Sequence, residues 1–173
     1  TGLVSGNQAS IWVVARHTSL PSPNPGLIQG SSTGNAYSAT ANLKHVGMWV
    51  NSTNTQPWGR GVRSDGTELN ITQTTATASG TIYILNNDYG ATNIQQYINN
   101  AAAGSVATNG TLRSWTDMAI GVQAGSEGWN GDIAEVIAFN VSLNGVQRII
   151  VSNYLSAKYG LGLSASDLYI QDN

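Results

Sequence analysis

Residues 131–160, "GDIAEVIAFNVSLNGVQRIIVSNYLSAKYG", join a strong strand signal to the one clear helix signal of the chain. Residues 132–139 are rich in apolar and β-branched side chains, which favours a strand. Residues 144–158 instead place apolar side chains at helical spacing. The stretch therefore predicts a strand followed by a single helix of about four turns.

The predicted helix has recognisable ends. Its apolar positions are Val146, Ile149, Ile150, Tyr154 and Ala157. Ser142 or Asn144 can cap its start, because either side chain can accept a hydrogen bond from a free backbone N–H. Lys158 in the last turn and Gly160 just beyond it are typical of a helix end. We expect the apolar stripe, with Ile150 near its centre, to dock on the rest of the domain.

The remainder of the chain predicts short strands separated by turns. The predicted strands cover 10–16, 43–50, 68–74, 81–87, 93–100 and 117–124, with a short final strand over 167–171. Many short strands around one helix indicate an all-β fold, a two-sheet antiparallel jelly-roll sandwich with one C-terminal helix. A length of 173 residues suits a single domain over 1–173.

Turn-forming residues give finer predictions. The Pro- and Gly-rich stretches 17–35 and 51–66 predict loops. The pair Asn99–Asn100 suits a tight turn, because Asn tolerates positive φ. Within 117–124, Met118, Ile120 and Val122 are predicted to share one face of a strand.

Composition excludes several classes of function. Only 9% of the residues are charged, and the net charge is −2 with seven Lys and Arg. No basic patch is available for nucleic acid. The chain has no cysteine, and no apolar run approaches the roughly 20 residues of a membrane span. Because it starts with neither Met nor a signal peptide, we expect a segment of a longer exported protein.

The segment "GWNGDIAEVIAFNVSLNGVQRIIVSNYLSAKYGL", residues 128–161, resembles the C-terminal signature of bacterial laminin-G-like domains. The matching residues are Gly131, Ile133, Ala134, Glu135, Val136, Ile137, Asn140, Tyr154, Leu155, Lys158, Tyr159 and Gly160. The family belongs to the concanavalin A-like lectin and glucanase superfamily. The resemblance implies a jelly roll in an extracellular or cell-surface setting, bacterial or phage, but it implies no particular ligand.

Retaining glucanases of this superfamily carry their carboxylates on a similar strand, as Glu-x-Asp-x-x-Glu. The corresponding residues here are Asn130, Asp132 and Glu135. An amide at Asn130 cannot form the covalent intermediate of a retaining mechanism. In a regular strand Asp132 and Glu135 also point to opposite faces, although a bulge would bring them together. We therefore expect a non-catalytic, buried core strand whose Glu135 is hydrogen-bonded by the helix or a backbone turn.

Five tryptophans are the best candidates for ligand contacts. Trp12 lies in an apolar run and is expected in the core, whereas Trp115 is left open. The predicted ligand-binding residues are Trp58, Asn54, Gln56, Arg60, Trp49 and Trp129. Trp58 is placed in a loop, where its ring could stack on a sugar while nearby amides contact hydroxyl groups. Core packing is the alternative for each tryptophan.

No spacing of His or Cys suggests a metal site, and His17 and His45 are expected to be surface or hydrogen-bonded residues. The resemblance implies calcium, which binds through carboxylate and carbonyl oxygens. The candidate ligands are Asp65 and Asp88, with an ordinary turn Asp as the alternative for each.

Three functions remain open. The first is a non-catalytic module that binds a glycan or a surface protein. The second is a structural unit of an adhesin, filament or virion, since low charge favours self-assembly within a larger structure. The third is a glycoside hydrolase, which Asn130 disfavours.

Overall fold

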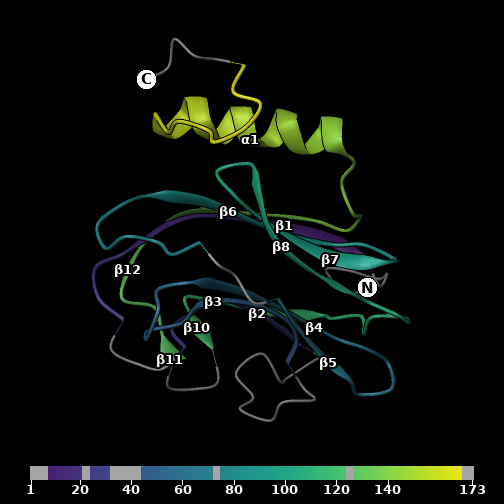
Figure 1. Cartoon of the computed structure of the whole chain (residues 1–173). Helices are drawn as coiled ribbons and strands as arrows, with labels where there is room; N and C mark the ends of the chain where they lie inside the picture. The colour runs from purple at the N-terminus through teal and green to yellow at the C-terminus, as the bar shows by residue number, and fades with distance from the viewer. Residues whose placement is uncertain (1–7, 21–23, 32–43, 72–74, 124–126, 169–173) are drawn as a thin grey trace.

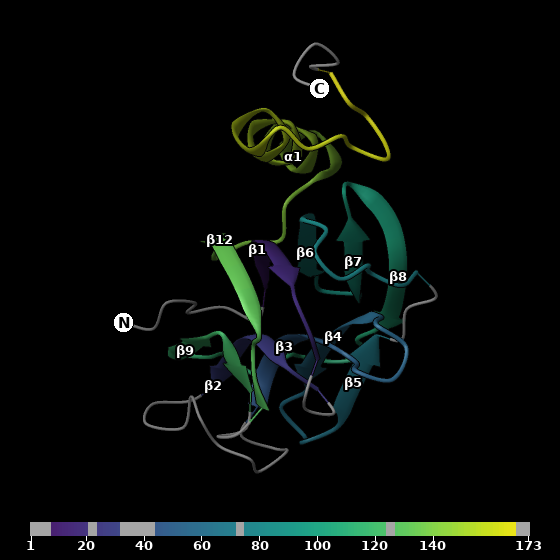
Figure 2. The ribbon, with the colours of Figure 1, turned by 90° about the vertical axis from the view of Figure 1, so that its left-hand side faces the viewer.

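The chain folds into three layers, a helix and two five-stranded antiparallel sheets (Figures 1 and 2). This computed structural model describes residues 8–20, 24–31, 44–71, 75–123 and 127–168. The helix α1 (Gly145–Tyr159) lies on the outside of one sheet, called here the helix-side sheet, and the other is the far sheet. The predicted all-β sandwich with one C-terminal helix is confirmed.

The chain crosses between the two sheets several times and forms most of its strands in consecutive runs within one sheet. The helix-side sheet has the order β12–β1–β6–β7–β8, with β12 (Gly131–Phe139), β1 (Ala9–His17), β6 (Tyr83–Tyr89), β7 (Asn93–Ile98) and β8 (Ala101–Ala107). The far sheet has the order β5–β4–β3–β2–β9, with β5 (Glu68–Ile71), β4 (Pro57–Val62), β3 (Lys44–Val50), β2 (Gly26–Ser31) and β9 (Asp117–Ile120). A short ribbon pairs β10 (Val122–Gln123) with β11 (Glu127–Gly128).

Strand β1 separates two hydrophobic cores. Ile11 and Val13 belong to the core between the sheets, while Trp12 and Val14 belong to the core under α1. Because both faces of β1 are covered, its sequence is a continuous apolar run rather than an alternating one. The prediction of Trp12 as a core residue is confirmed, and Trp115, which was left open, is also core at 2% exposed.

Two strands of the far sheet lie in stretches that were predicted as loops. Strand β2 lies within 17–35 and β4 within 51–66. Their inward positions include Gly30 and Gly61, where an added Cβ would collide with Val46 and Ile94 respectively. The missing side chains make room for the facing residues, so the glycines that suggested loops are part of the core.

Other strand predictions need smaller corrections. The segment 117–124 is broken at Gly121, whose φ is +75°, so Val122 does not continue β9. Ile120 lies at the open edge of the sandwich and is 50% exposed. Of the predicted final strand, residues 167–168 form none, and 169–171 lie outside the described residues, as do residues 72–74 of another predicted strand.

The tight turn at Asn99–Asn100 is confirmed. Both residues have positive φ, 46° and 65°, and they join β7 to β8. The Asn99 side chain accepts a hydrogen bond from the backbone N–H of Ile84 at 2.9 Å, and the Asn100 amide donates to the carbonyl of Ala165 at 2.8 Å. The turn is therefore tied to the segment that follows α1.

The helix ends are also confirmed, and the choice of cap is resolved. Asn144 is the N-cap, in a capping box with Gln147. Gly160 ends the helix at φ 60° and ψ 45°. Ser142 instead donates a hydrogen bond to Asp88 at 2.7 Å. Within the described residues, no helix has the length and apolar character needed to cross a bilayer.

The predicted docking face of α1 is wrong. Ile150, at the centre of the predicted apolar stripe, is 62% exposed. The helix instead packs through Leu155, with Ser152 and Ser156 also buried. These two small side chains let the helix lie close to the sheet, while Asn153 donates to the carbonyl of Ser166 and accepts from the N–H of Leu168.

Strand β12 is an edge strand with a bulge, and not the buried core strand that was predicted. Val14 pairs with Glu135 and Ala15 pairs with Ile133, which leaves Ala134 as the extra residue. Ile133 packs on the core between the sheets, whereas Glu135 shares the helix side with Ile137. The bulge thus shifts the alternation of side chains by one residue.

Candidate functional site

Trp49 and Trp58 form an aromatic pair on the outer face of the far sheet. They are direct partners across β3 and β4, with ring centroids 5.9 Å apart and planes tilted by 35°. Neighbouring Met48 and Gly59 face the core, so both indoles point away from it. Trp58 therefore lies in a strand, and its predicted placement in a loop is wrong.

A charged pair continues this face along β4. Arg60 lies two residues beyond Trp58 and is 8% exposed. Its guanidinium forms an ion pair with Glu68 of β5. Burial lowers the pKa of Arg60, and the neighbouring carboxylate partly offsets that shift. Asn70, the direct partner of Arg60 on β5, is exposed, so the outer face opens at its β5 edge.

The turn between β3 and β4 adds amides at the end of the same face. The Asn54 amide donates to the Gln56 side-chain oxygen at 2.7 Å, and the backbone N–H of Gln56 donates to the Asn54 side chain at 3.2 Å. Gln56 precedes Trp58 by two residues in an extended chain, so both side chains lie on one side. The structure thus gathers five of the six predicted ligand residues along one hairpin. We call Gln56, Trp58, Arg60, Glu68 and Asn70 the tryptophan face.

The two indoles differ in exposure and share one unusual feature. Trp49 is 5% exposed, whereas Trp58 is half-buried. In the described part of the chain, neither indole N–H has a hydrogen-bond acceptor, although both nitrogens are buried. Such orphaned donors cost roughly 1 to 3 kcal/mol each and call for a structural or functional explanation.

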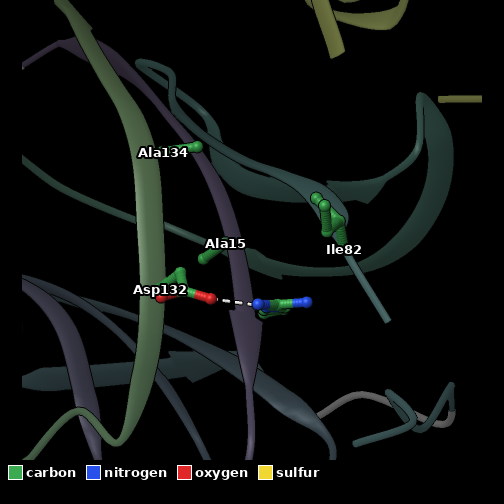
Figure 3. Close-up of a pocket in the computed structure, with 5 residues that line it drawn as sticks. Ala15, Ile82, Asp132 and Ala134 are labelled. Atoms are coloured by element: carbon green, nitrogen blue, oxygen red, sulfur yellow. Dashed lines mark hydrogen bonds and ion pairs between the residues drawn. The ribbon is translucent and has the colours of Figure 1, made fainter. Parts of the chain in front are cut away.

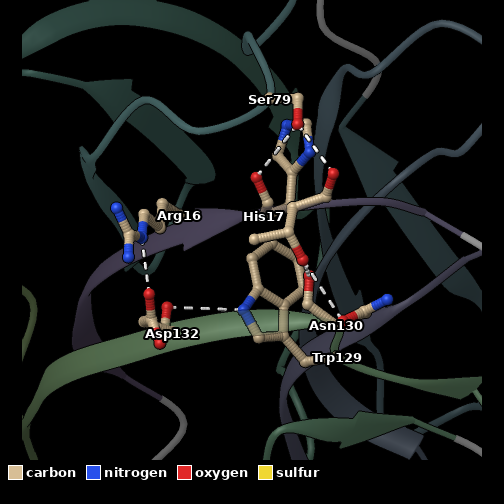
Figure 4. A network of polar contacts seen from close by, with 7 residues as sticks. Arg16, His17, Ser79, Trp129, Asn130 and Asp132 are labelled. Carbon is tan, nitrogen blue, oxygen red and sulfur yellow. Dashed lines mark hydrogen bonds and ion pairs between the residues drawn. The ribbon is translucent and has the colours of Figure 1, made fainter.

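Trp129, the sixth predicted ligand residue, lies elsewhere. Its ring and that of His17 form a T-shaped contact at a centroid distance of 6.1 Å, and its indole N–H donates to the backbone carbonyl of Asp132 at 3.4 Å (Figure 4). It packs against the core between the sheets. Trp129 therefore belongs to a polar network around the ends of β1 and β12 and is not part of the tryptophan face.

A cavity of about 220 Å³ lies beside β1 and β12 (Figure 3). It is lined by Ala15, Arg16, Ile82, Asp132 and Ala134. The Arg16 guanidinium and the Asp132 carboxylate form an ion pair at 2.5 Å on its rim. The lining combines an apolar floor with one solvent-exposed charged pair, which makes the cavity a second candidate site.

The bulge changes the relation between the two carboxylates of β12. Asp132 pairs with Arg16 and Glu135 with Lys158, and both lie on the helix side of the sheet. The prediction that they point to opposite faces is therefore wrong. The expected hydrogen bonding of Glu135 by the helix is confirmed, at 3.2 Å from Lys158.

The position of the glucanase nucleophile is occupied by an amide that holds structure together. The Asn130 amide donates to Ser19 Oγ at 2.6 Å, and its side-chain oxygen accepts from Thr18 at 3.3 Å. No carboxylate is present at this position to attack a sugar. Asn130 therefore ties β12 to the segment after β1 and offers no nucleophile.

The two histidines are buried and hydrogen-bonded. His17 Nε2 lies 3.1 Å from Thr77 Oγ1, and His45 Nδ1 donates to the carbonyl of Ser114 at 2.7 Å. Burial lowers the pKa of both imidazoles, which favours their neutral forms. Each therefore fits the predicted hydrogen-bonded role.

Both candidate calcium ligands accept hydrogen bonds from neighbouring groups of the protein. The Asp65 carboxylate accepts from Arg63 at 2.8 Å and from the N–H of Thr67 at 2.9 Å, as a turn Asp does. The Asp88 carboxylate accepts from Ser142 and from the N–H of Leu143. Calcium needs six to eight oxygen ligands, and the described residues contain no group of three acidic or histidine side chains around a common point.

No protein-family model matches the chain, and no curated protein matches it by sequence. Solved structures do resemble it. An SAP-like heptameric pentraxin from Limulus polyphemus has a TM-score of 0.60 at 14% identity, over 92% of this chain and 77% of the pentraxin. The CBM40 domain of an IT-sialidase from Ruminococcus gnavus, bound to α2,3-sialyllactose, gives 0.62 at 12%, over 85% and 83%.

A third similar structure is domain 4 of AbnA, an extracellular arabinanase from Geobacillus stearothermophilus, in complex with arabinotriose. It gives a TM-score of 0.61 at 18% identity, over 84% of this chain and 66% of that domain. Identities this low establish the fold alone. The chain has the fold of a two-sheet jelly-roll sandwich.

Proposed function

We propose that this domain is a non-catalytic glycan-binding module of an exported or cell-surface protein, with the tryptophan face as its binding surface. Two of the similar structures support the proposal, because they hold arabinotriose and sialyllactose on the same fold. The finer assignment to bacterial laminin-G-like domains, made from the C-terminal signature, is part of this proposal.

One observation carries the proposal. A half-buried Trp58, backed by Trp49, stands beside the ion pair of Arg60 and Glu68 on the outer face of the far sheet. Sugar-binding surfaces need an apolar platform for the C–H face of a ring and fixed polar groups for its hydroxyls. This face offers both within two neighbouring strands.

The charge of the face indicates the kind of glycan. Arg60 and Glu68 neutralise each other, and Gln56 and Asn70 supply uncharged amides. A neutral sugar would therefore suit the face better than an acidic one, because an added carboxylate would compete with Glu68 for the same guanidinium. Trp58 would stack on the ring, while Asn70 and Gln56 would contact hydroxyl groups on either side.

The first test is a glycan array that includes arabino-oligosaccharides and sialyllactose, followed by calorimetry on the best neutral ligand. Trp58→Ala should weaken that binding by about 2 kcal/mol, roughly thirtyfold, because a buried aromatic contact is commonly a binding hot spot. Trp129→Ala, which removes another half-buried tryptophan outside the face, should leave the affinity unchanged.

Trp58→Ala should also lower the melting temperature, because Trp58 packs on Trp49. Asn70→Ala separates binding from stability, since Asn70 is exposed. It should weaken glycan binding while the melting temperature stays at the wild-type value. Normal affinity in both Trp58→Ala and Asn70→Ala would remove this face from the proposed function.

A further inference from the structure

Thr55 holds a backbone conformation that its side chain disfavours. Its φ is +54°, in the left-handed region that is uncommon for residues other than glycine and least favourable for a β-branched one. The residue lies in the turn between β3 and β4, with Asn54 and Gln56 on either side of it. Such a conformation persists only where surrounding contacts hold it, and it is found mostly at functional sites. The contacts that hold Thr55 therefore also affect the two amides next to it.

Thr77 supplies those contacts from the segment before β6. The backbone N–H and the side-chain hydroxyl of Thr77 both donate to the carbonyl of Thr55, each at 2.8 Å. Thr77 is 4% exposed, so these hydrogen bonds are shielded from water. The hydroxyl has a single proton, and the Thr55 carbonyl takes it because a carbonyl can only accept. Toward any other partner, Thr77 Oγ1 must therefore act as the acceptor.

His17 is that other partner, and the geometry determines its tautomer. Its Nε2 lies 3.1 Å from Thr77 Oγ1. Because that oxygen must accept, Nε2 carries the proton and Nδ1 carries the lone pair. Among the residues that the structure describes, none forms a hydrogen bond with Nδ1, although this nitrogen is buried. A relay of hydrogen bonds thus runs from the end of β1, through Thr77, to Thr55 in the turn between β3 and β4.

The surroundings of His17 do not suit an imidazolium. The ring borders a void of about 10 Å³, which has room for at most one water and is lined mainly by apolar side chains. Two charged groups lie nearby, Arg16 and Asp132, but they pair with each other (Figure 4). Tyr83 also lines the void, and its hydroxyl accepts from the N–H of Ala78 at 2.9 Å. Burial lowers the pKa of His17, since a second proton would leave Nδ1–H without an acceptor.

We propose that His17 and Thr77 are positioning residues for the tryptophan face, which hold Thr55 in its left-handed conformation and thereby direct the Gln56 side chain toward the bound sugar. The inference rests on the proposed function, in which the Gln56 amide contacts a sugar hydroxyl. Relaxation of Thr55 to negative φ would turn the peptide before Gln56 and move its side chain. Protonation of His17 loosens the relay, because an imidazolium has to leave its buried position to be solvated. Glycan affinity should therefore fall with pH through His17.

Two-dimensional NMR on the unliganded 173-residue chain tests the relay without any glycan. In the wild type, the backbone and side-chain amide signals of Gln56 should shift as the pH falls from about 8 to about 4.5. His17→Gln should lose this shift, because the glutamine amide can donate to Thr77 in place of Nε2 but does not titrate. His45→Asn is the matched control. It removes the other imidazole of the chain, keeps a donor for the Ser114 carbonyl, and should titrate like the wild type.

Calorimetry with arabinotriose, a neutral probe, then tests the consequence for binding. Thr77→Val removes the hydroxyl with little change of shape and should weaken binding about fivefold, the effect of losing roughly one hydrogen bond to the sugar. His17→Gln should bind like the wild type at about pH 8 and keep that affinity as the pH falls. Leu155→Ala, which lowers stability in the core under α1, should leave the affinity unchanged.

Two NMR results would overturn the positioning role. One is a pH response of Gln56 that survives in His17→Gln, and the other is a Thr77→Val variant whose Gln56 signals match those of the wild type. Equal losses of affinity in Thr77→Val and Leu155→Ala would also overturn it, because the relay would then act only through stability. If no glycan binds at all, the proposed function fails, and the NMR titration still decides the role of His17 and Thr77.

Discussion

Ala134 shows how one residue alters the chemistry of a strand. Because it is the extra residue of a bulge, it brings Asp132 and Glu135 to the same side of β12. Asn130 nevertheless offers an amide where a retaining glucanase needs a carboxylate nucleophile. That amide is bound to Thr18 and Ser19. Both carboxylates instead form ion pairs, Asp132 with Arg16 and Glu135 with Lys158.

Asp88 should give the stability of the protein a measurable pH dependence. Burial raises the pKa of its carboxyl, although hydrogen bonds from Ser142 and Leu143 partly oppose the shift. The folded protein therefore binds this proton more tightly than the unfolded chain does. The stability that Asp88 contributes is fully present below the unfolded pKa, and it is lost as the pH rises through the folded pKa.

Asp88→Asn should remove this dependence, because the amide stays neutral. We expect the melting temperature of the wild type, relative to Asp88→Asn, to fall as the pH rises above the ordinary pKa range of a free Asp. Asp65→Asn is the control, for which we expect a pH dependence of opposite sign. A hydrogen bond from Thr67 and the nearby Arg63 lower the pKa of Asp65, so its contribution is lost as the pH falls. The opposite pKa shifts of Asp88 and Asp65 would be contradicted if the melting-temperature difference from wild type changed in the same direction with pH for both variants.

At the scale of the element, α1 has two faces that compete for the sheet. Its N-cap and its end at Gly160 follow from local sequence. Its rotation about its own axis does not, because the exposed stripe through Ile150 is more apolar than the buried face with Ser152 and Ser156. Close approach decided the outcome: two serines and Leu155 fit against the sheet where a row of large side chains would hold the helix away.

Leu155 should therefore be the stability anchor of the helix. Leu155→Ala removes a side chain that is 0% exposed in the core under α1 and should cost about 2 to 4 kcal/mol of unfolding free energy. Ile150→Ala, at an exposed position of the same helix, should change it by less than about 0.5 kcal/mol. Urea unfolding of each variant at low protein concentration measures both free-energy changes. A larger loss from Ile150→Ala would reverse the orientation assigned to the helix.

At the scale of the whole molecule, a jelly-roll sandwich is compatible with binding and with catalysis, so the distinction rests on the site. We expect mixed-linkage and β-1,3 glucans to survive prolonged incubation with this protein, because Asn130 replaces the nucleophile. Reducing-sugar release is the measurement, and Glu135→Gln is the control variant. Glucan cleavage that disappears in Glu135→Gln would restore the hydrolase interpretation.

Several features were determined by the sequence alone. The apolar run that became β1, the strand and capped helix of 131–160, and the turn at Asn99–Asn100 are all encoded by near neighbours. Capping hydrogen bonds, positive φ at Asn and the alternation of side chains act over a few residues. Local patterns therefore suffice to predict these elements and the all-β class of the fold.

Only the tertiary structure decided the rest. From the sequence alone, Gly30 and Gly61 indicate loops. In the folded protein, Val46 and Ile94 on other strands occupy the space that a side chain at these two positions would need. The pairing of Trp49 with Trp58 likewise required the register of β3 against β4. Residues distant in the chain decide three things: the side chain that packs over each glycine, the partner of each tryptophan, and the side of the helix that is covered. Such contacts follow from packing between surfaces, and no local pattern encodes them.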